Sequence, residues 1–214
     1  VVSAMEEADT ILTVTLTDTQ DTVSGTVGTD TLISIEKVIA GTGNDTFTAT
    51  AGAVLNGFSF DAGSSGVDVL NYQAWTQSGV VYNLQTGAVS VGGAQYQTIS
   101  GFENIYAGAN GDTLFADTQA GLANEYSMGG GNDLVTYANV ASALTVTLAA
   151  SGNATITGVG TDKLYSVESI TGGAGADTFI GDSASGSVGG YYLAGGGRSD
   201  VAVYNLSGHN FTVD

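Results

Sequence analysis

Short stretches in which apolar and polar residues alternate run along the whole chain, with glycines between them. Residues 10–19 (TILTVTLTDT) and 46–50 (TFTAT) are two examples. Alternation with a period of two indicates β-strands with one buried face, and glycines between strands indicate tight turns with positive φ. An apolar pattern with the helical period of about 3.6 residues does not continue for three turns anywhere in the sequence. The pattern therefore predicts an all-β fold.

The alternating stretches belong to three copies of one sequence unit. The copies are TDTLISIEKVIAGTGNDTFTAT (29–50), YQTISGFENIYAGANGDTLFAD (96–117) and TDKLYSVESITGGAGADTFIGD (161–182). Asp45, Asp112 and Asp177 hold the same place in them, at offsets of 112 − 45 = 67 and 177 − 112 = 65 residues. A repeat with a fixed period predicts an architecture in which each unit stacks on the next.

A second aspartate divides each unit further. Asp68, Asp133 and Asp200 follow the first aspartates by 23, 21 and 23 residues, and the next first aspartate comes 44 residues later in both cases. Since 44 is twice 22, the spacing predicts a parallel β-solenoid with three coils of about 22 residues in each unit. The middle coil has no aspartate marker.

A third set of short stretches recurs in phase with the aspartates: VTL (14–16), YNL (82–84), VTL (146–148) and FTV (211–213). The chain therefore begins inside one unit and ends inside another. We expect residues 1–214 to form one continuous β-solenoid. Its units are about 1–50 (partial), 51–117, 118–182 and 183–214 (partial).

Each unit also has a glutamate nine residues before its first aspartate. These are Glu36, Glu103 and Glu168. Apolar positions such as Val38 and Phe47 are nine residues apart as well, which predicts a half-coil of nine residues with the glutamates on the edge opposite the aspartates.

Composition narrows the ligands that the chain can bind. Lys37, Lys163 and Arg198 face 21 acidic residues, so the formal charge is 3 − 21 = −18. This charge disfavours nucleic acid and anionic membranes and favours cations. The chain has no cysteine, and its one histidine, His209, is expected at the surface. No apolar run approaches the roughly 20 residues that cross a bilayer, so we expect no membrane insertion.

Calcium is the cation that this residue pattern fits. It takes about six to eight oxygen ligands from carboxylates and backbone carbonyls in a flexible geometry. Two stacked glycine loops can supply them, because glycine lets carbonyls turn inward beside an aspartate from each loop. The spacing predicts three sites, between Asp45 and Asp68, Asp112 and Asp133, and Asp177 and Asp200. The glutamates, assisted by Asn56 and Asn124, could form a second set, or could simply accept hydrogen bonds from backbone amides at a corner.

The stretch GGAGADTFI (172–180) matches GGxGxDxUx, the nonapeptide of RTX (repeats-in-toxin, hemolysin-type) calcium-binding proteins, and GTGNDTFT and GGGNDLVT are close to it. The resemblance implies a right-handed parallel β-roll with glycine-rich calcium loops, folding on calcium outside the cell after type I secretion. It also implies a set of metal ligands. The carboxylates would be Asp45, Asp68, Asp112, Asp133, Asp177 and Asp200, and the carbonyls those of Gly41, Gly43, Gly108, Gly129, Gly131, Gly173 and Gly175, with Glu36, Glu103 and Glu168 as further candidates. Asn110, Met128 and the extra residue in GGGRSD before Asp200 depart from the motif.

These features favour a calcium-binding structural repeat segment of a secreted or cell-surface bacterial protein, such as an adhesin, a matrix protein or a surface-layer or filament-like protein. No nucleophile elbow or histidine-serine arrangement indicates an enzyme. Head-to-tail self-association through open solenoid ends is a further expectation.

Two other functions remain open at this point. The chain could be the noncatalytic calcium module of a secreted epimerase, lipase or protease. It could also be a recognition module. In that case the threonines of residues 10–19 would bind ice, or a set of aromatic residues would bind a glycan, namely Trp75, Tyr72, Tyr82, Tyr106, Tyr191 and Tyr192. Threonine filling of solvent-facing strand positions and partly buried aromatic packing are the simpler explanations of the same residues.

Overall fold

The computed structural model describes residues 2–3, 11–17, 19–25, 28–119, 121–149, 152–181 and 191–204. His209 and the FTV stretch (211–213) lie outside these residues. The described part has strands and turns and no helix, which confirms the all-β prediction. Since no helix occurs there, none of the described residues forms a helix able to cross a bilayer.

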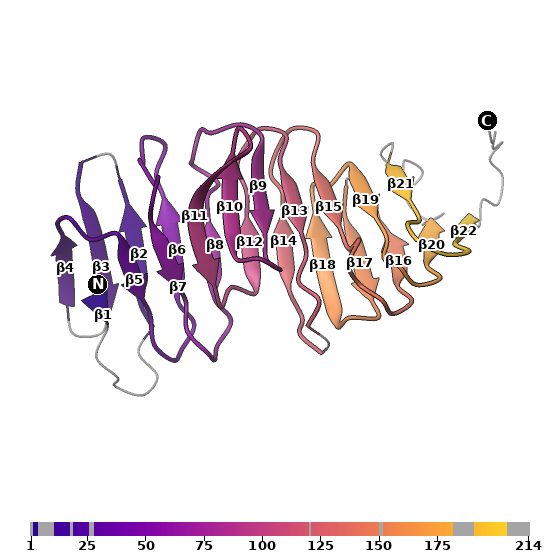
Figure 1. The fold of residues 1–214 in the computed structure, drawn as a ribbon, viewed down its shortest axis with the longest axis horizontal. Helices are drawn as coiled ribbons and strands as arrows, with labels where there is room; N and C mark the ends of the chain where they lie inside the picture. Colours follow the sequence, from indigo (N-terminus) through magenta and orange to yellow (C-terminus); the bar gives the residue numbers. More distant parts are fainter. Residues whose placement is uncertain are drawn as a thin grey trace.

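The strands form two sheets that face each other along an elongated stack (Figure 1). Sheet A has ten strands in the order β1 (Val2–Ser3), β5 (Lys37–Ile39), β7 (Ser59–Asp61), β11 (Ala94–Ser100), β10 (Ala88–Val91), β9 (Val80–Asn83), β13 (Thr113–Phe115), β15 (Leu134–Thr136), β19 (Ser169–Thr171) and β21 (Tyr192–Ala194). Sheet B has twelve in the order β22 (Val201–Tyr204), β20 (Thr178–Gly181), β16 (Thr145–Leu148), β17 (Ala154–Thr157), β18 (Thr161–Tyr165), β14 (Glu125–Ser127), β12 (Asn104–Tyr106), β8 (Val69–Asn71), β6 (Thr46–Ala49), β2 (Thr13–Leu16), β3 (Asp21–Gly25) and β4 (Gly28–Leu32).

Through much of the chain, consecutive strands alternate between the two sheets. Val38 of β5 in sheet A and Phe47 of β6 in sheet B, nine residues apart, are both buried between the sheets, as the half-coil prediction requires. Each then pairs in parallel with the strand one coil later: Val38 lies opposite Phe60 and Phe47 opposite Leu70. These separations of 60 − 38 = 22 and 70 − 47 = 23 residues match the predicted coil length.

The coil predicted to have no aspartate marker does not form as a coil. In its place the chain forms a three-stranded antiparallel meander within one sheet: β9, β10 and β11 in sheet A, and β16, β17 and β18 in sheet B. The meander in sheet A turns at Gly92 and Gly93, whose φ angles of 61° and 81° suit a two-residue hairpin that joins Val91 to Ala94. The chain already reverses once at residues 84–87, between β9 and β10, and the second reversal at this hairpin keeps β11 in sheet A as well.

Because of the meander, each unit visits the sheets an odd number of times. Equivalent strands of successive units therefore lie in opposite sheets: β6 in sheet B, β13 in sheet A and β20 in sheet B. Any feature that recurs once per unit consequently changes faces from one unit to the next and returns to the same face after two units.

Large apolar and aromatic side chains fill the space between the sheets. The ring centroid of Phe47 lies 5.3 Å from that of Phe60 and 5.2 Å from that of Phe102. Tyr72, Tyr82 and Trp75 are also buried, whereas Tyr192 is 71% exposed. The three buried rings pack in the core, so they cannot form a glycan-binding surface.

Candidate functional site

The aspartates predicted to pair do lie on adjacent glycine loops. The backbone amide of Asp45 donates to Asp68 Oδ1 at 2.6 Å, that of Asp112 to Asp133 Oδ1 at 2.7 Å, and that of Asp177 to Asp200 Oδ1 at 2.8 Å. Each aspartate directly precedes a strand, and parallel pairing of those strands sets the two loops in register. The aspartate side chain of one loop thus holds the backbone at the start of the strand that follows the neighbouring loop.

Further amide-to-carboxylate hydrogen bonds extend these aspartate pairs along the stack. We call the resulting chains of hydrogen bonds aspartate ladders. Asp45, Asp112 and Asp177 accept the amides of Leu12, Val80 and Leu144 at 2.7, 2.9 and 2.8 Å. At the other end, the amides of Asp68 and Asp133 donate to Glu103 Oε2 at 2.8 Å and Glu168 Oε2 at 2.9 Å. The ladders are therefore Leu12–Asp45–Asp68–Glu103, Val80–Asp112–Asp133–Glu168 and Leu144–Asp177–Asp200.

Two of the three glutamates, Glu103 and Glu168, belong to the aspartate ladders. Glu103 does lie on the edge opposite Asp112, but the change of sheets along the chain makes this the edge of Asp68, whose amide it accepts. The alternative that these glutamates accept backbone amides is confirmed for Glu103 and Glu168. Asn124 belongs to a different network, because its amide donates to Asp162 Oδ1 at 3.2 Å.

The glycines of the stacked loops are required by close contact between neighbouring loops. A Cβ atom on Gly66 would lie 1.6 Å from the carbonyl oxygen of Gly43, and one on Gly129 would lie 1.8 Å from that of Gly108. Some of the carbonyls predicted as calcium ligands already accept backbone hydrogen bonds: Gly108 from Gly130 at 3.2 Å and Gly173 from Gly197 at 3.0 Å. Their oxygens keep a second lone pair for a further ligand.

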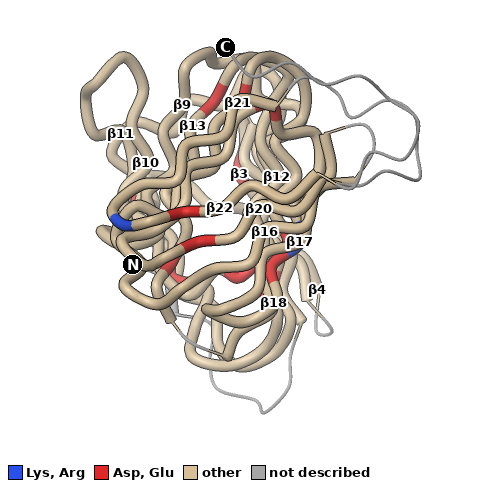
Figure 2. Tube along the Cα trace, turned by 90° about the vertical axis from the view of Figure 1, so that its right-hand side faces the viewer, with Lys and Arg blue, Asp and Glu red and all other residues tan. Residues whose placement is uncertain are grey.

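The ladders bury acidic groups in a chain that is already strongly negative. Figure 2 shows the stack end-on, with acidic positions far outnumbering basic ones. Asp68 and Asp133 are 2% and 1% exposed. Burial raises the pKa of each to about 7, against the lowering effect of its amide hydrogen bond, and the neighbouring Glu103 or Glu168 raises the pKa further. Burial also raises the pKa of Asp45 and Asp112.

Several buried carboxylate oxygens lack any hydrogen-bond partner. They are Asp45 Oδ2 in the first ladder and Asp112 Oδ2 and Asp133 Oδ2 in the second. In the third ladder, Asp177 Oδ2 accepts the amide of Gly173 at 2.6 Å. A buried carboxylate oxygen without a partner is costly unless a proton or a cation compensates it, so the first two ladders have unused capacity for a cation.

This donor set fits calcium in chemistry, because it consists of carboxylate and carbonyl oxygens. Among the described residues no three acidic, histidine or cysteine side chains gather around one point. The ladders supply one carboxylate from each loop, and backbone carbonyls and water would have to complete the coordination.

A second buried polar pair was missed from the sequence. The hydroxyl of Tyr72 donates to Gln97 Oε1 at 2.6 Å, and in the next unit Tyr137 donates to Asp162 Oδ2 at 2.9 Å. The alternation in TDKLY (161–165) was a usable signal, because it places Asp162 on the same face as the buried Leu164. The buried tyrosine hydroxyl thus contacts a neutral amide in one unit and a carboxyl group in the next.

Asp162→Asn should stabilise the protein above pH 6 and leave it unchanged at pH 4. Burial raises the pKa of Asp162 to about 6, against the hydrogen bond from Tyr137 that lowers it. A carboxyl with a raised pKa contributes its full stability below its ordinary pKa and loses it as the pH rises through the folded value. Asparagine can keep its oxygen for the Asn124 amide and donate its Nδ2 to the Tyr137 hydroxyl, without a charge, so we expect a gain of about 2 kcal/mol at pH 8.

Chemical unfolding between pH 4 and pH 8, in constant calcium, measures this difference. Gln97→Glu is the reciprocal control, since it places a carboxyl beside Tyr72 and should lose stability over the same pH range. Equal stability of Asp162→Asn and the unmodified chain at pH 8 would contradict the prediction.

No protein-family model matches this chain, and no curated protein sequence matches it.

Proposed function

We propose that this chain is a calcium-binding structural repeat segment of a secreted or cell-surface bacterial protein, similar in its calcium loops to RTX proteins. The observation that supports this best is the pairing of aspartates on stacked glycine loops, in which Asp45, Asp112 and Asp133 each have a buried Oδ2 without a partner. Buried carboxylates of this kind are compensated most simply by an oxygen-seeking cation.

The residues that would hold calcium are Asp45 with Asp68, and Asp112 with Asp133, together with carbonyls of the adjoining loops. Bound calcium would supply positive charge between the carboxylates. The ladders hold these aspartates on the strand ends, the glycines allow the loops to approach, and the apolar core excludes water from the inner side. Asp177 and Asp200 form the weakest of the three candidate pairs, since Asp177 Oδ2 already has an amide partner.

The parallel strands that follow the loops support a right-handed β-roll as the finer description of the fold, interrupted by the antiparallel meanders. In this proposal the role of the segment is mechanical. Without calcium, the carboxylates of a chain with formal charge −18 repel one another and weaken the stacking of loops. With millimolar extracellular calcium the loops are bridged and the stack becomes rigid. A low calcium concentration inside the cell would keep the chain unfolded for export.

Circular dichroism and thermal unfolding of the purified chain, with calcium and with a chelator, test the proposal. We expect a gain of β signal or a large rise in melting temperature on adding calcium, with a midpoint of about 10⁻⁴ to 10⁻³ M, the range of extracellular modules. Magnesium at the same concentration is the control, because it dehydrates reluctantly and needs a stricter geometry. Identical spectra and melting temperatures in calcium and in chelator would refute it.

A further inference from the structure

Strands β4, β3, β2 and β6 form the N-terminal end of sheet B (Figure 1), and their outward residues make a regular array of hydroxyl groups. The pairing register aligns eight side chains in two rows across these strands. The first row is Thr29, Ser24, Thr13 and Thr46, and the second is Thr31, Thr22, Thr15 and Thr48. All eight are exposed or half-buried, and all point away from the core. We call this surface the hydroxyl array.

The array recurs two units later on the same sheet. The equivalent positions on β18, β17, β16 and β20 form a row of Thr161, Thr157, Thr145 and Thr178, and a second row of Lys163, Thr155, Thr147 and Ile180. Because equivalent strands change sheets in successive units, these two arrays share one face of the molecule, and the equivalent positions of the intervening unit lie on sheet A.

Strand propensity alone does not explain this distribution. If threonine only filled solvent-facing strand positions, it would be spread over both faces. Sheet A has a few outward threonines, Thr98, Thr113 and Thr171, but its other outward positions include Lys37, Ile39, Ser59, Asp61, Val81 and Asn83. In a chain with 21 acidic residues, none of the eight positions of the hydroxyl array is charged. Threonine is therefore concentrated where the register makes it a two-dimensional lattice.

The spacing of that lattice follows from sheet geometry. Neighbouring strands lie about 4.8 Å apart, and outward residues of one strand recur every 6.7 Å or so. These repeats are close to those of water oxygens on the prism faces of ice. Each threonine offers a hydroxyl that can anchor a water molecule and a methyl group around which water is ordered. The array has no aromatic ring on which a sugar could stack, which disfavours a glycan.

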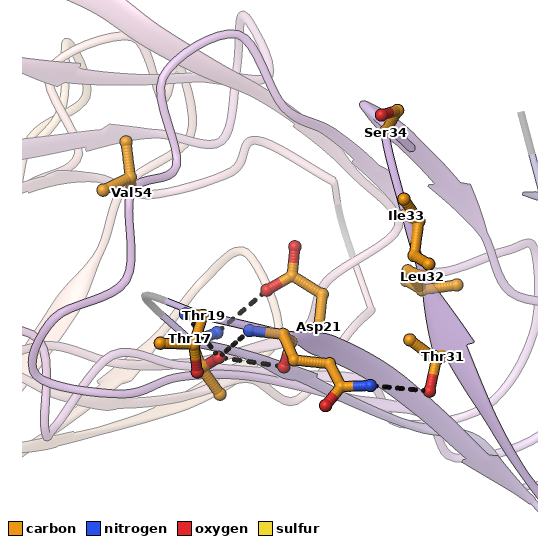
Figure 3. Close-up of a pocket in the computed structure, with 9 residues that line it drawn as sticks. Thr17, Thr19, Asp21, Thr31, Leu32, Ile33, Ser34 and Val54 are labelled. Carbon is orange, nitrogen blue, oxygen red and sulfur yellow. Dashed lines mark hydrogen bonds between the residues drawn. The ribbon is translucent and has the colours of Figure 1, made fainter.

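We propose that the hydroxyl array binds ice. This function goes beyond calcium binding, and none of the eight side chains belongs to an aspartate ladder. At β4 the array borders an open cavity of about 630 Å³ whose lining includes Thr31, Gln20 and Asp21 (Figure 3). There Gln20 Nε2 donates to Thr31 Oγ1 at 2.9 Å, and Asp21 Oδ1 accepts the amide of Thr17 at 2.9 Å. These bonds hold the end of the second row in place.

Thermal hysteresis and partition into a growing ice hemisphere, measured in calcium, test the proposal. The unmodified chain should show both. Thr15→Tyr, at the centre of the second row, should lose most of the hysteresis, because a bulky ring breaks the lattice while tyrosine suits a strand. Ser59→Tyr on the outer face of sheet A is the matched control and should keep it. Thr22→Tyr on the adjacent hairpin serves as a second variant if Thr15→Tyr does not fold.

Circular dichroism in the same samples separates this test from that of the calcium proposal. A folded, unmodified chain without hysteresis, equal loss in the sheet A control, or binding to crystalline chitin or cellulose but not to ice would each overturn the inference. Hysteresis that persists in chelator, with an unchanged β signal, would support the ice surface and refute the calcium proposal.

Discussion

Gly129→Ala should destabilise the protein by about 4 kcal/mol or more, enough to unfold a domain of ordinary stability. The φ angle of Gly129 is 86°, and a Cβ atom there would lie 1.8 Å from the carbonyl oxygen of Gly108 in the neighbouring loop. That contact is with backbone, so relief requires the two stacked loops to separate. Separation would also weaken the hydrogen bond from the Asp112 amide to Asp133, which begins a few residues further along the same loops.

Gly93→Ala is a closely matched control. Its φ angle is 81°, yet a Cβ atom there would have no neighbour within 4 Å. Alanine at Gly93 therefore has nearly the same backbone strain, about 1–2 kcal/mol, without the steric clash. Urea unfolding of both variants in calcium measures the difference, and similar losses of stability would show that the loops do not stack as closely as described.

The pairing of aspartates could be predicted from sequence because it depends only on the number of residues between them. Asp45 and Asp68 are separated by one coil length, and parallel strands one coil apart lie next to each other. The same reasoning placed Val38 and Phe47 on opposite sheets. Where a motif recurs at the period of the structure itself, sequence spacing translates directly into distance.

The meanders could not be predicted from that spacing, since a separation of 44 residues fits two coils as well as one antiparallel excursion. The local signal was the Gly92–Gly93 pair between alternating stretches, which suits a two-residue hairpin. The hydrogen-bond partners of Glu103 and Glu168 could not be predicted for the same reason. Their place follows from the number of times the chain crosses between sheets, which is a global property of each unit.

The buried oxygens show a different limit. The sequence predicted carboxylates at the loop corners, but it could not show that Asp177 Oδ2 has an amide partner and Asp133 Oδ2 has none. This difference depends on the direction of single amide groups. It makes the second ladder the sharpest place to separate a structural hydrogen bond from metal binding.

Two substitutions at Asp133 should separate these roles. Asp133→Ala removes the acceptor of the Asp112 amide, which lies at 2.7 Å, and should cost about 1–3 kcal/mol in chelator and more in calcium, because the metal ligand is lost as well. Asp133→Asn keeps an acceptor and removes only the charge. If Asp133 binds calcium, Asn should leave the chain at least as stable in chelator and remove most of the stabilisation that calcium adds through this site. That stabilisation is about 2.7 kcal/mol at a hundredfold excess over Kd.

Unfolding of both variants at a series of calcium concentrations measures how steeply the free energy of unfolding rises with calcium. Asp200→Asn in the third ladder is the comparison, because its neighbour Asp177 has an amide partner on Oδ2 and the pair should gain less from calcium. If calcium stabilises the Asp133→Asn variant as much as the unmodified chain, the ladder is held by hydrogen bonds and does not bind calcium at Asp133. The proton on a carboxyl whose pKa burial raises to about 7 would then compensate the buried oxygen instead of a metal.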